Sequence, residues 1–228
     1  MRRGGRLAAA IVATFIAQAA HAQLSTTIGV DSDYRYRGVS LSNSNPSPRL
    51  TLNFDGAERW YVGASATRAA LTAQETYAQL TAYAGWLAAT IDGASVELGA
   101  VGSHFAGSAG YDFVEGYVGL LARDWSARLY LSPDYYGRNV ATASVELNVH
   151  VPLDDRARVF AHVGALVPLR SAPGDAGKAR GDVSIGAGVV LGGWDLHVAS
   201  VAATRGGPYP AVYNGRHATV VVGVALSF

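Results

Sequence analysis

The chain ends on the stretch His217-Ala218-Thr219-Val220-Val221-Val222-Gly223-Val224-Ala225-Leu226-Ser227-Phe228. From Ala218 onward every second residue is apolar, and the residues between them are small or polar except for Val221. Side chains of a β-strand point alternately to its two faces, so this period of two predicts a strand with one apolar face. A tilted strand of about ten residues is long enough to cross a bilayer.

The same alternation recurs along most of the chain. Residues 144–151 alternate polar side chains with Val and Leu, and residues 182–191 largely alternate Asp, Ser and Gly with Val, Ile and Ala. The segments with this pattern are about 25–37, 48–54, 60–68, 75–90, 94–105, 112–121, 125–132, 141–152, 157–169, 181–191, 194–204 and 216–228. We therefore expect an all-β fold, a transmembrane up-and-down antiparallel β-barrel of about twelve strands, with both termini on one side of the membrane.

The connections between these segments alternate in length. Short ones with turn residues lie at 55–59, 91–93, 122–124, 153–156 and 192–193, and three of them carry the hairpin dipeptides Asp-Gly or Gly-Gly. The connections between them are mostly longer, as at 38–47, 170–180 and 205–215. Outer-membrane barrels have short periplasmic turns and longer external loops, so the pattern also predicts an orientation.

The first residues predict export. Arg2, Arg3 and Arg6 precede an apolar run over residues 7–20, and Ala20-His21-Ala22 supplies the small residues that a signal peptidase needs. The run is short for a membrane anchor. We expect residues 1–22 to be a signal peptide and residues 23–228 to be the barrel, with the cell outer membrane as its location.

Aromatic residues are sorted between the two expected ends. Trp60, Trp125 and Trp194 sit beside short turns, and Trp86 lies shortly before one. The opposite ends carry tyrosines, namely Tyr34, Tyr36, Tyr111, Tyr135, Tyr136, Tyr209 and Tyr213. Amphipathic rings prefer the headgroup level of a membrane, so we expect one aromatic girdle at each interface.

Two segments carry a family resemblance. They are Val30-Asp31-Ser32-Asp33-Tyr34-Arg35-Tyr36-Arg37-Gly38-Val39-Ser40 and Trp60-Tyr61-Val62-Gly63-Ala64-Ser65. They resemble the signature of the TorF family of porins, exported bacterial proteins of unknown function (Gcw_chp type), over about the first third of the mature chain. Leu41 and Glu58-Arg59 depart from that signature. The resemblance implies an outer-membrane barrel with a pore role and no catalytic residues.

The end of the chain implies a partner. A closing strand that finishes on Phe228 looks like the C-terminal recognition signal of outer-membrane proteins. We therefore expect Phe228 to bind the barrel-assembly machinery and outer-membrane lipid to surround the strands.

Charged side chains fall on the face opposite the apolar one. The predicted lumen-lining residues are Arg35, Arg37, Arg49, Glu75, Glu97, Glu115, Arg128, Glu146, Arg158 and Asp182. Their mixed signs allow two arrangements, a solvated constriction or a set of pairs that blocks the barrel. Small inward residues leave room in the first arrangement, and we favour a narrow channel because of Gly63, Gly99, Gly119, Gly164, Gly186, Gly188, Gly223 and Ala225.

The preferred function is therefore passive diffusion of small hydrophilic solutes. A closed structural or adhesive barrel is the alternative, although the loops are short for an adhesin. A lipid-modifying enzyme is the less favoured one. His104, with Ser103 and Ser108 nearby, and His217 lie near an external rim, but no acidic residue is evident that would orient His104. We expect no catalytic residue, cofactor or metal site, and the net charge of +1 gives no reason to expect a nucleic-acid partner.

Overall fold

The computed structural model describes residues 23–70, 76–170, 172–209 and 217–228. The signal-peptide prediction for residues 1–22 lies outside these residues, as do Glu75 and Tyr213. Within the described part of the chain, no helix is long and apolar enough to cross a membrane.

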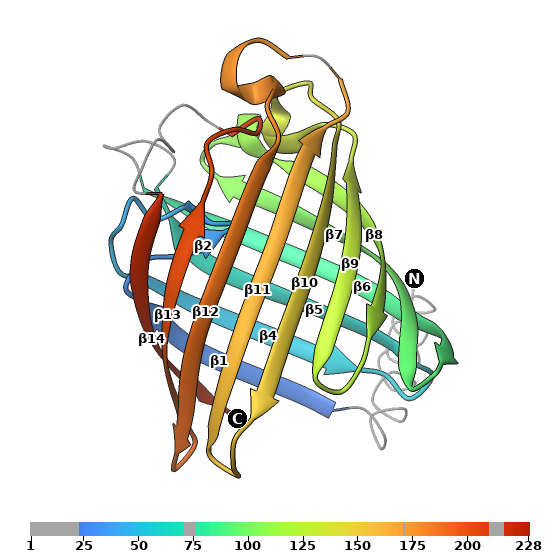
Figure 1. Cartoon of the computed structure of the whole chain (residues 1–228), viewed down its shortest axis with the longest axis vertical. Coiled ribbons are helices and arrows are strands. Elements are labelled where there is room, and N and C mark those ends of the chain that lie inside the picture. The colour runs from blue at the N-terminus through green and yellow to red at the C-terminus, as the bar shows by residue number, and fades with distance from the viewer. Residues whose placement is uncertain (1–22, 71–75, 171, 210–216) are drawn as a thin grey trace, which may run out of the picture.

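Antiparallel strands form a closed barrel (Figure 1). The barrel strands are β1(Gln23–Asp31), β4(Ser47–Asp55), β5(Trp60–Ala69), β6(Tyr77–Ile91), β7(Ala94–Ala106), β8(Phe113–Leu121), β9(Trp125–Ser132), β10(Thr142–Pro152), β11(Ala157–Pro168), β12(Arg180–Leu191), β13(Trp194–Ala203) and β14(Ala218–Ser227). Each strand pairs with the next barrel strand along the chain, and β1 also pairs with β14. The prediction of an up-and-down barrel of about twelve strands is confirmed.

The two ends of the chain close the barrel. The register between β1 and β14 runs from Thr27 opposite Ser227 to Asp31 opposite Gly223. Phe228 continues it, because its N–H donates to the carbonyl of Thr26 at 2.9 Å and its carbonyl accepts from the N–H of Thr26 at 3.2 Å. The backbone of the last residue is therefore part of the sheet, whereas its side chain is exposed.

Each strand separates an apolar outer face from a polar inner one. Along β8, Val114 and Val118 are exposed. The residues of the other parity, Phe113, Glu115 and Tyr117, are buried in the barrel. Leu, Ile and Val side chains are exposed in the same way along the other strands. Lipid favours such a surface, whereas water would not.

The connections follow the predicted lengths. Short turns at 56–59, 92–93, 122–124, 153–156 and 192–193 lie at one end, and longer connections with the 3₁₀ turns η2(Ala109–Tyr111), η3(Tyr135–Gly137) and η4(Gly174–Gly177) lie at the other (Figure 1). Trp60, Trp125 and Trp194 begin strands directly after short turns, and Trp86 pairs with Trp60. All four tryptophans thus lie at the short-turn end.

The first predicted strand is too long. It was expected over residues 25–37, but β1 ends at Asp31. Residues 33–42 fold into the barrel, whereas residues 43–46 of the expected external loop are exposed. The expected girdle of tyrosines is also wrong in part, because Tyr135 and Tyr136 are fully buried and Tyr36 and Tyr209 pack against them or their neighbours. These rings stack on other side chains inside the barrel, so they cannot reach the headgroup level.

Replacing Phe228 should impair assembly more than stability. Its side chain is 70% exposed, so Phe228→Ala removes little packing and leaves the backbone pairing with Thr26 intact. We expect less heat-modifiable, folded barrel in the membranes of expressing cells, but an unchanged urea midpoint after refolding in vitro. Equal amounts of folded Phe228→Ala and unaltered protein in cells would contradict recognition of this residue by the assembly machinery.

Candidate functional site

The segment that folds inward is a short hairpin of β2(Arg35–Tyr36) and β3(Val39–Ser40). Its turn uses left-handed backbone conformations at Arg37, with φ 48°, and at Gly38, with φ 71°. A Cβ on Gly38 would lie 2.7 Å from that of Asp182 and 2.6 Å from that of Ala203. Only glycine therefore lets the turn approach the wall formed by β12 and β13.

The carboxylate of Asp33 holds the base of this hairpin together. It accepts hydrogen bonds from Arg35 Nε at 2.7 Å, Ser40 Oγ at 2.5 Å and Ser42 Oγ at 3.1 Å. The N–H of Leu41 donates to the carbonyl of Tyr34 at 2.7 Å. The motif that resembles the TorF signature is thus a self-bonded hairpin inside the barrel.

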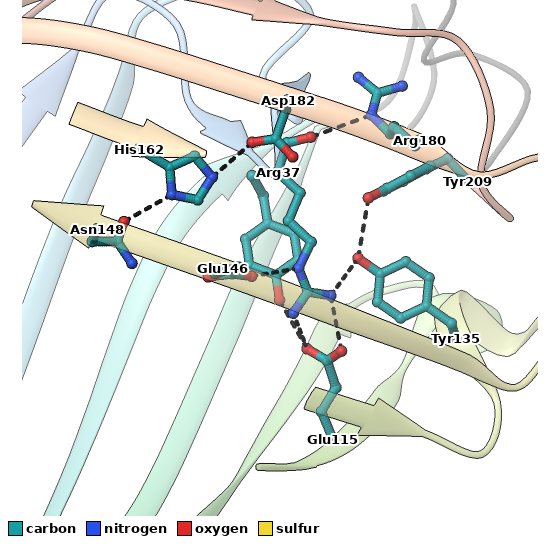
Figure 2. Close-up of polar contacts among 10 residues, drawn as sticks. Arg37, Glu115, Tyr135, Glu146, Asn148, His162, Arg180, Asp182 and Tyr209 are labelled. Atoms are coloured by element: carbon teal, nitrogen blue, oxygen red, sulfur yellow. Dashed lines mark hydrogen bonds and ion pairs between the residues drawn. The ribbon is translucent and has the colours of Figure 1, made fainter. Parts of the chain in front are cut away.

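Arg37 at the tip of the hairpin crosses the lumen to β8 and β10 (Figure 2). Its guanidinium donates two hydrogen bonds to Glu115, at 2.8 and 3.0 Å, and a third to Glu146 at 2.7 Å. A fourth reaches the hydroxyl of Tyr135 at 3.0 Å. The hydroxyl of Tyr36 donates to Glu115 at 2.9 Å. One buried cation therefore joins the buried carboxylate of Glu115, which it contacts through two hydrogen bonds, to the partly buried carboxylate of Glu146.

An aromatic cluster lies beside Arg37, toward the end with the longer connections. Its members are Phe105, Phe113, Tyr135, Tyr136 and Tyr209. The Phe113 and Tyr136 ring centroids are 4.6 Å apart, and the hydroxyls of Tyr135 and Tyr209 are 3.3 Å apart. Burial raises the pKa of Tyr135 well above its usual value, so its hydroxyl stays protonated. The cluster packs the lumen at this level.

A second polar group lies nearer the short-turn end. Glu97, which has no exposed surface, accepts from Arg128 Nε at 2.5 Å and from the hydroxyl of Tyr61 at 2.7 Å. The hydroxyls of Tyr61 and Tyr117 are 2.7 Å apart. These side chains come from β5, β7, β8 and β9, so they connect four strands across the inner wall.

The wall formed by β10 to β13 holds further pairs. The His162 ring lies between Asn148 Oδ1 and Asp182 Oδ2, each 2.8 Å from a ring nitrogen (Figure 2). Arg158 and Asp195 are 2.8 Å apart. On the neighbouring strands β1 and β4, the contact is longer, because Arg49 Nη2 is 3.4 Å from Asp31 Oδ2.

Nine of the ten predicted lumen residues lie in the described part of the chain, and Glu75 does not. Arg37, Glu115 and Glu146 form one cluster, Glu97 and Arg128 a second, and Asp182 bonds His162. Arg35 is inside the hairpin, paired with Asp33. Arg49 pairs with Asp31, and Arg158 pairs with Asp195.

The space that small inward residues were expected to leave is filled. A Cβ on Gly63 would collide with the ring of Tyr83, one on Gly99 with Tyr117, and one on Gly186 with Phe160. The same holds, with Arg, His, Asp or Glu side chains, for Gly119, Gly164, Gly188 and Gly223. Large side chains of neighbouring strands lie flat over these glycines.

Around the hairpin, the described part of the lumen is nevertheless hollow in places. One cavity of about 600 Å³ is lined by Tyr36, Tyr61, Glu97 and Arg128. Another of about 570 Å³ is lined by Arg35, Arg37, His150 and His162 among others. The third, of about 320 Å³, is lined by Tyr34, Tyr36, Arg49 and Gln79 among others. All three end on the hairpin, so the hairpin divides the interior.

The inward tyrosines were missed by the sequence reasoning. Tyr61, Tyr83 and Tyr117 lie on the same parity as the predicted lumen residues, and that parity could have placed them inside. Nothing in the alternation indicated that Tyr135, Tyr136 and Tyr209 turn inward, because they belong to connections.

The lipid-enzyme alternative gains an orienting acid but not a nucleophile. Asp112 Oδ2 is 2.6 Å from Nδ1 of His104, so the expectation that no acidic residue orients this histidine is wrong. Ser103, however, lies on the face of β7 opposite to His104. It is buried there and accepts a hydrogen bond from Gln79 of β6. Among the residues that the structure describes, no group of three or more His, Asp or Glu is placed to hold a metal ion.

A closed antiparallel barrel with an apolar outside and a polar inside is the architecture of outer-membrane β-barrels. The chain belongs to the family described as "Bacterial protein of unknown function (Gcw_chp)", whose model matches residues 16–221. No curated protein matches it in sequence.

Solved porin structures share the fold. The NanC porin is similar with a TM-score of 0.60 at 11% identity, over 90% of this chain and 99% of that chain. The KdgM porin is similar with a TM-score of 0.57 at 13% identity, over 90% of this chain and 99% of that one. A second KdgM structure, in complex with disordered oligogalacturonate, gives 0.56 at 11% identity, over 90% of this chain and 98% of that one.

Breaking the Glu97–Arg128 pair should destabilise the barrel. Arg128→Met leaves a fully buried carboxylate without its cation, which costs about 3 kcal/mol. We expect the free energy of unfolding, measured by urea titration of the barrel in lipid vesicles, to fall by about that amount. The double variant Arg128→Met/Glu97→Gln should recover much of the loss, because no buried charge remains. A single variant as stable as the unaltered barrel would show that Glu97 is solvated.

Proposed function

We propose that this protein is an outer-membrane porin through which small hydrophilic solutes diffuse past the β2–β3 hairpin. The observation that carries the proposal is the polar interior, with three cavities that meet at one hairpin. A purely structural barrel has no need of such cavities. The constriction would be the ring around Arg37, Glu115 and Glu146, where the hairpin tip reaches the wall.

The closed structural barrel is the second candidate, because the aromatic cluster favours it. Tyr135 and Tyr136 are fully buried, and Phe113 packs on both. If these rings do not move, no solute passes at the end with the longer connections. Purified protein in a planar bilayer separates the candidates, since discrete conductance steps support the porin and a silent, folded barrel supports the closed form.

Solute preference follows from the pairing of charges. Arg37, Arg128 and Arg158 each face a carboxylate at hydrogen-bonding distance. A lumen whose cations are already neutralised has little field left to attract acidic sugars. We therefore expect small neutral or zwitterionic solutes rather than an acidic oligosaccharide such as the KdgM structure contains.

Removing the hairpin's anchor should widen the channel. Arg37→Ala deletes the ion pairs with Glu115 and Glu146, so the hairpin loses its hold on β8 and β10. We expect single-channel conductance to rise several-fold. Arg49→Ala is the charge-matched control, because Arg49 makes only a long contact with Asp31, and it should change conductance little. Equal conductance of Arg37→Ala and Arg49→Ala would show that the hairpin does not limit the flow of ions through the barrel.

Ion selectivity should follow the same pair. With Arg37 removed, Glu115 and Glu146 keep their negative charge without a cation, so cations are favoured in the constriction. In Arg37→Ala, we expect the reversal potential under a salt gradient to move from near zero toward the equilibrium potential of the cation. Glu115→Gln should move it in the opposite direction. Unshifted potentials in both variants would place the conduction path away from this cluster.

A further inference from the structure

The outer surface of the barrel is hollowed over β4 to β8. One row of paired residues crosses these strands, namely Leu52, Ala64, Ala82, Gly102 and Val114. Three small residues in succession, with a large one at each end, make a floor between two walls. The hollow has a volume of about 700 Å³, and we call it the lipid-facing trough.

The small residues continue toward the middle of the barrel. The next row holds Ala84, Ala100 and Gly116 side by side on β6, β7 and β8. Alternate residues of one strand are about 6.8 Å apart along it, so the small-residue band spans more than one row in the direction of a lipid chain. Many other positions of the lipid face carry exposed Leu, Ile and Val.

The end of the trough nearer the longer connections is polar. His104 pairs with Leu80 one row above Gly102, and it is 53% exposed. Asp112 accepts from the Phe105 N–H at 2.8 Å and contacts His104 Nδ1 at 2.6 Å. An ionised carboxylate can only accept, so the Nδ1–H donates to it and Nε2 is the ring nitrogen left for a ligand. Nε2 donates to a phosphate oxygen when the ring is a cation.

Arg68 adds a positive charge at the same end. It pairs with Ala78 on β6, one row further out than Ala66, which lines the trough. Its guanidinium makes only long hydrogen bonds, 3.2 Å to the Pro46 carbonyl and 3.3 Å to Thr76 Oγ1. β5 and β7, which carry Arg68 and His104, are two interstrand spacings apart, or about 10 Å.

A second copy of the barrel does not suit this surface. A two-fold interface would bring the same surface of each copy together, and two facing hollows would enclose a void that costs packing energy. A flexible alkyl chain can fill a hollow, and the Arg68 guanidinium beside it attracts an anionic headgroup.

We propose that the trough binds one acyl chain of an outer-leaflet lipid whose headgroup carries a net negative phosphate, held by Arg68 and His104. The inference rests on the proposed membrane location but not on solute conduction. Asp112 acts as a positioning residue that fixes the orientation of the His104 ring.

Spin-labelled lipids test the proposal on the full-length barrel. The electron paramagnetic resonance spectrum reports the immobilised fraction of phosphatidylglycerol, which is anionic, and of phosphatidylcholine, which is not. We expect phosphatidylglycerol to be preferred about fivefold, the effect of one basic side chain near an anionic lipid. Arg68→Ala/His104→Ala should remove this preference and leave phosphatidylcholine binding unchanged.

Filling the trough tests its shape. A Cβ at Gly102 would meet only Val114, at 3.9 Å, so a side chain can start there without a clash, and Gly102→Leu should fill the trough and abolish the preference. Ala187→Leu, at an exposed position on β12, is the matched control and should keep it. If Gly102→Leu does not give a heat-modifiable folded barrel, Ala82→Val replaces it.

Two results would overturn the proposal. One is an equal lipid preference in Gly102→Leu and the unaltered barrel, and the other is a change of oligomeric state, seen by cross-linking, in Gly102→Leu. Conductance of the same variants is recorded in parallel. An unchanged conductance with a lost lipid preference would show that this site is separate from the pore. A barrel that does not conduct but keeps its lipid preference would contradict the porin proposal and support the lipid site.

Discussion

Backbone hydrogen bonding in lipid is the constraint on which the rest of this structure depends. Water is absent from the hydrocarbon, so each N–H and C=O of a spanning strand needs a partner within the sheet. β1 meets this need by pairing with both β4 and β14, and Phe228 extends the last pairing to Thr26. Closure leaves no free edge and encloses a lumen whose contents are then set by side chains.

Because the lumen is enclosed, a hairpin inside it can contact several strands of the wall. Inside it, Arg37 reaches Glu115 on β8 and Glu146 on β10, which are far from it in the chain. Partial burial strengthens such pairs and makes an unpaired charge costly. The motif around Asp33 keeps the hairpin folded by itself, so Arg37 arrives at the wall already oriented.

The inner and outer faces use small residues in opposite ways. On the inside, glycines such as Gly63 and Gly99 are covered by tyrosines of the neighbouring strand, so the space is filled. On the outside, the floor at Ala82 and Gly102 remains hollow, because no neighbouring side chain lies over it. The difference arises because inward side chains converge in a closed barrel, whereas outward ones diverge.

The sequence by itself determined the strands, their faces, the alternation of short and long connections and the sorting of tryptophans. These features depend on a period of two and on local turn residues, which a single strand or hairpin already contains. Only the tertiary structure decided that residues 33–42 enter the barrel, that Tyr135 and Tyr209 stack inside it, and that Asp112 meets His104. Those outcomes depend on contacts between segments that the chain brings together only when the sheet closes, and no local pattern encodes them.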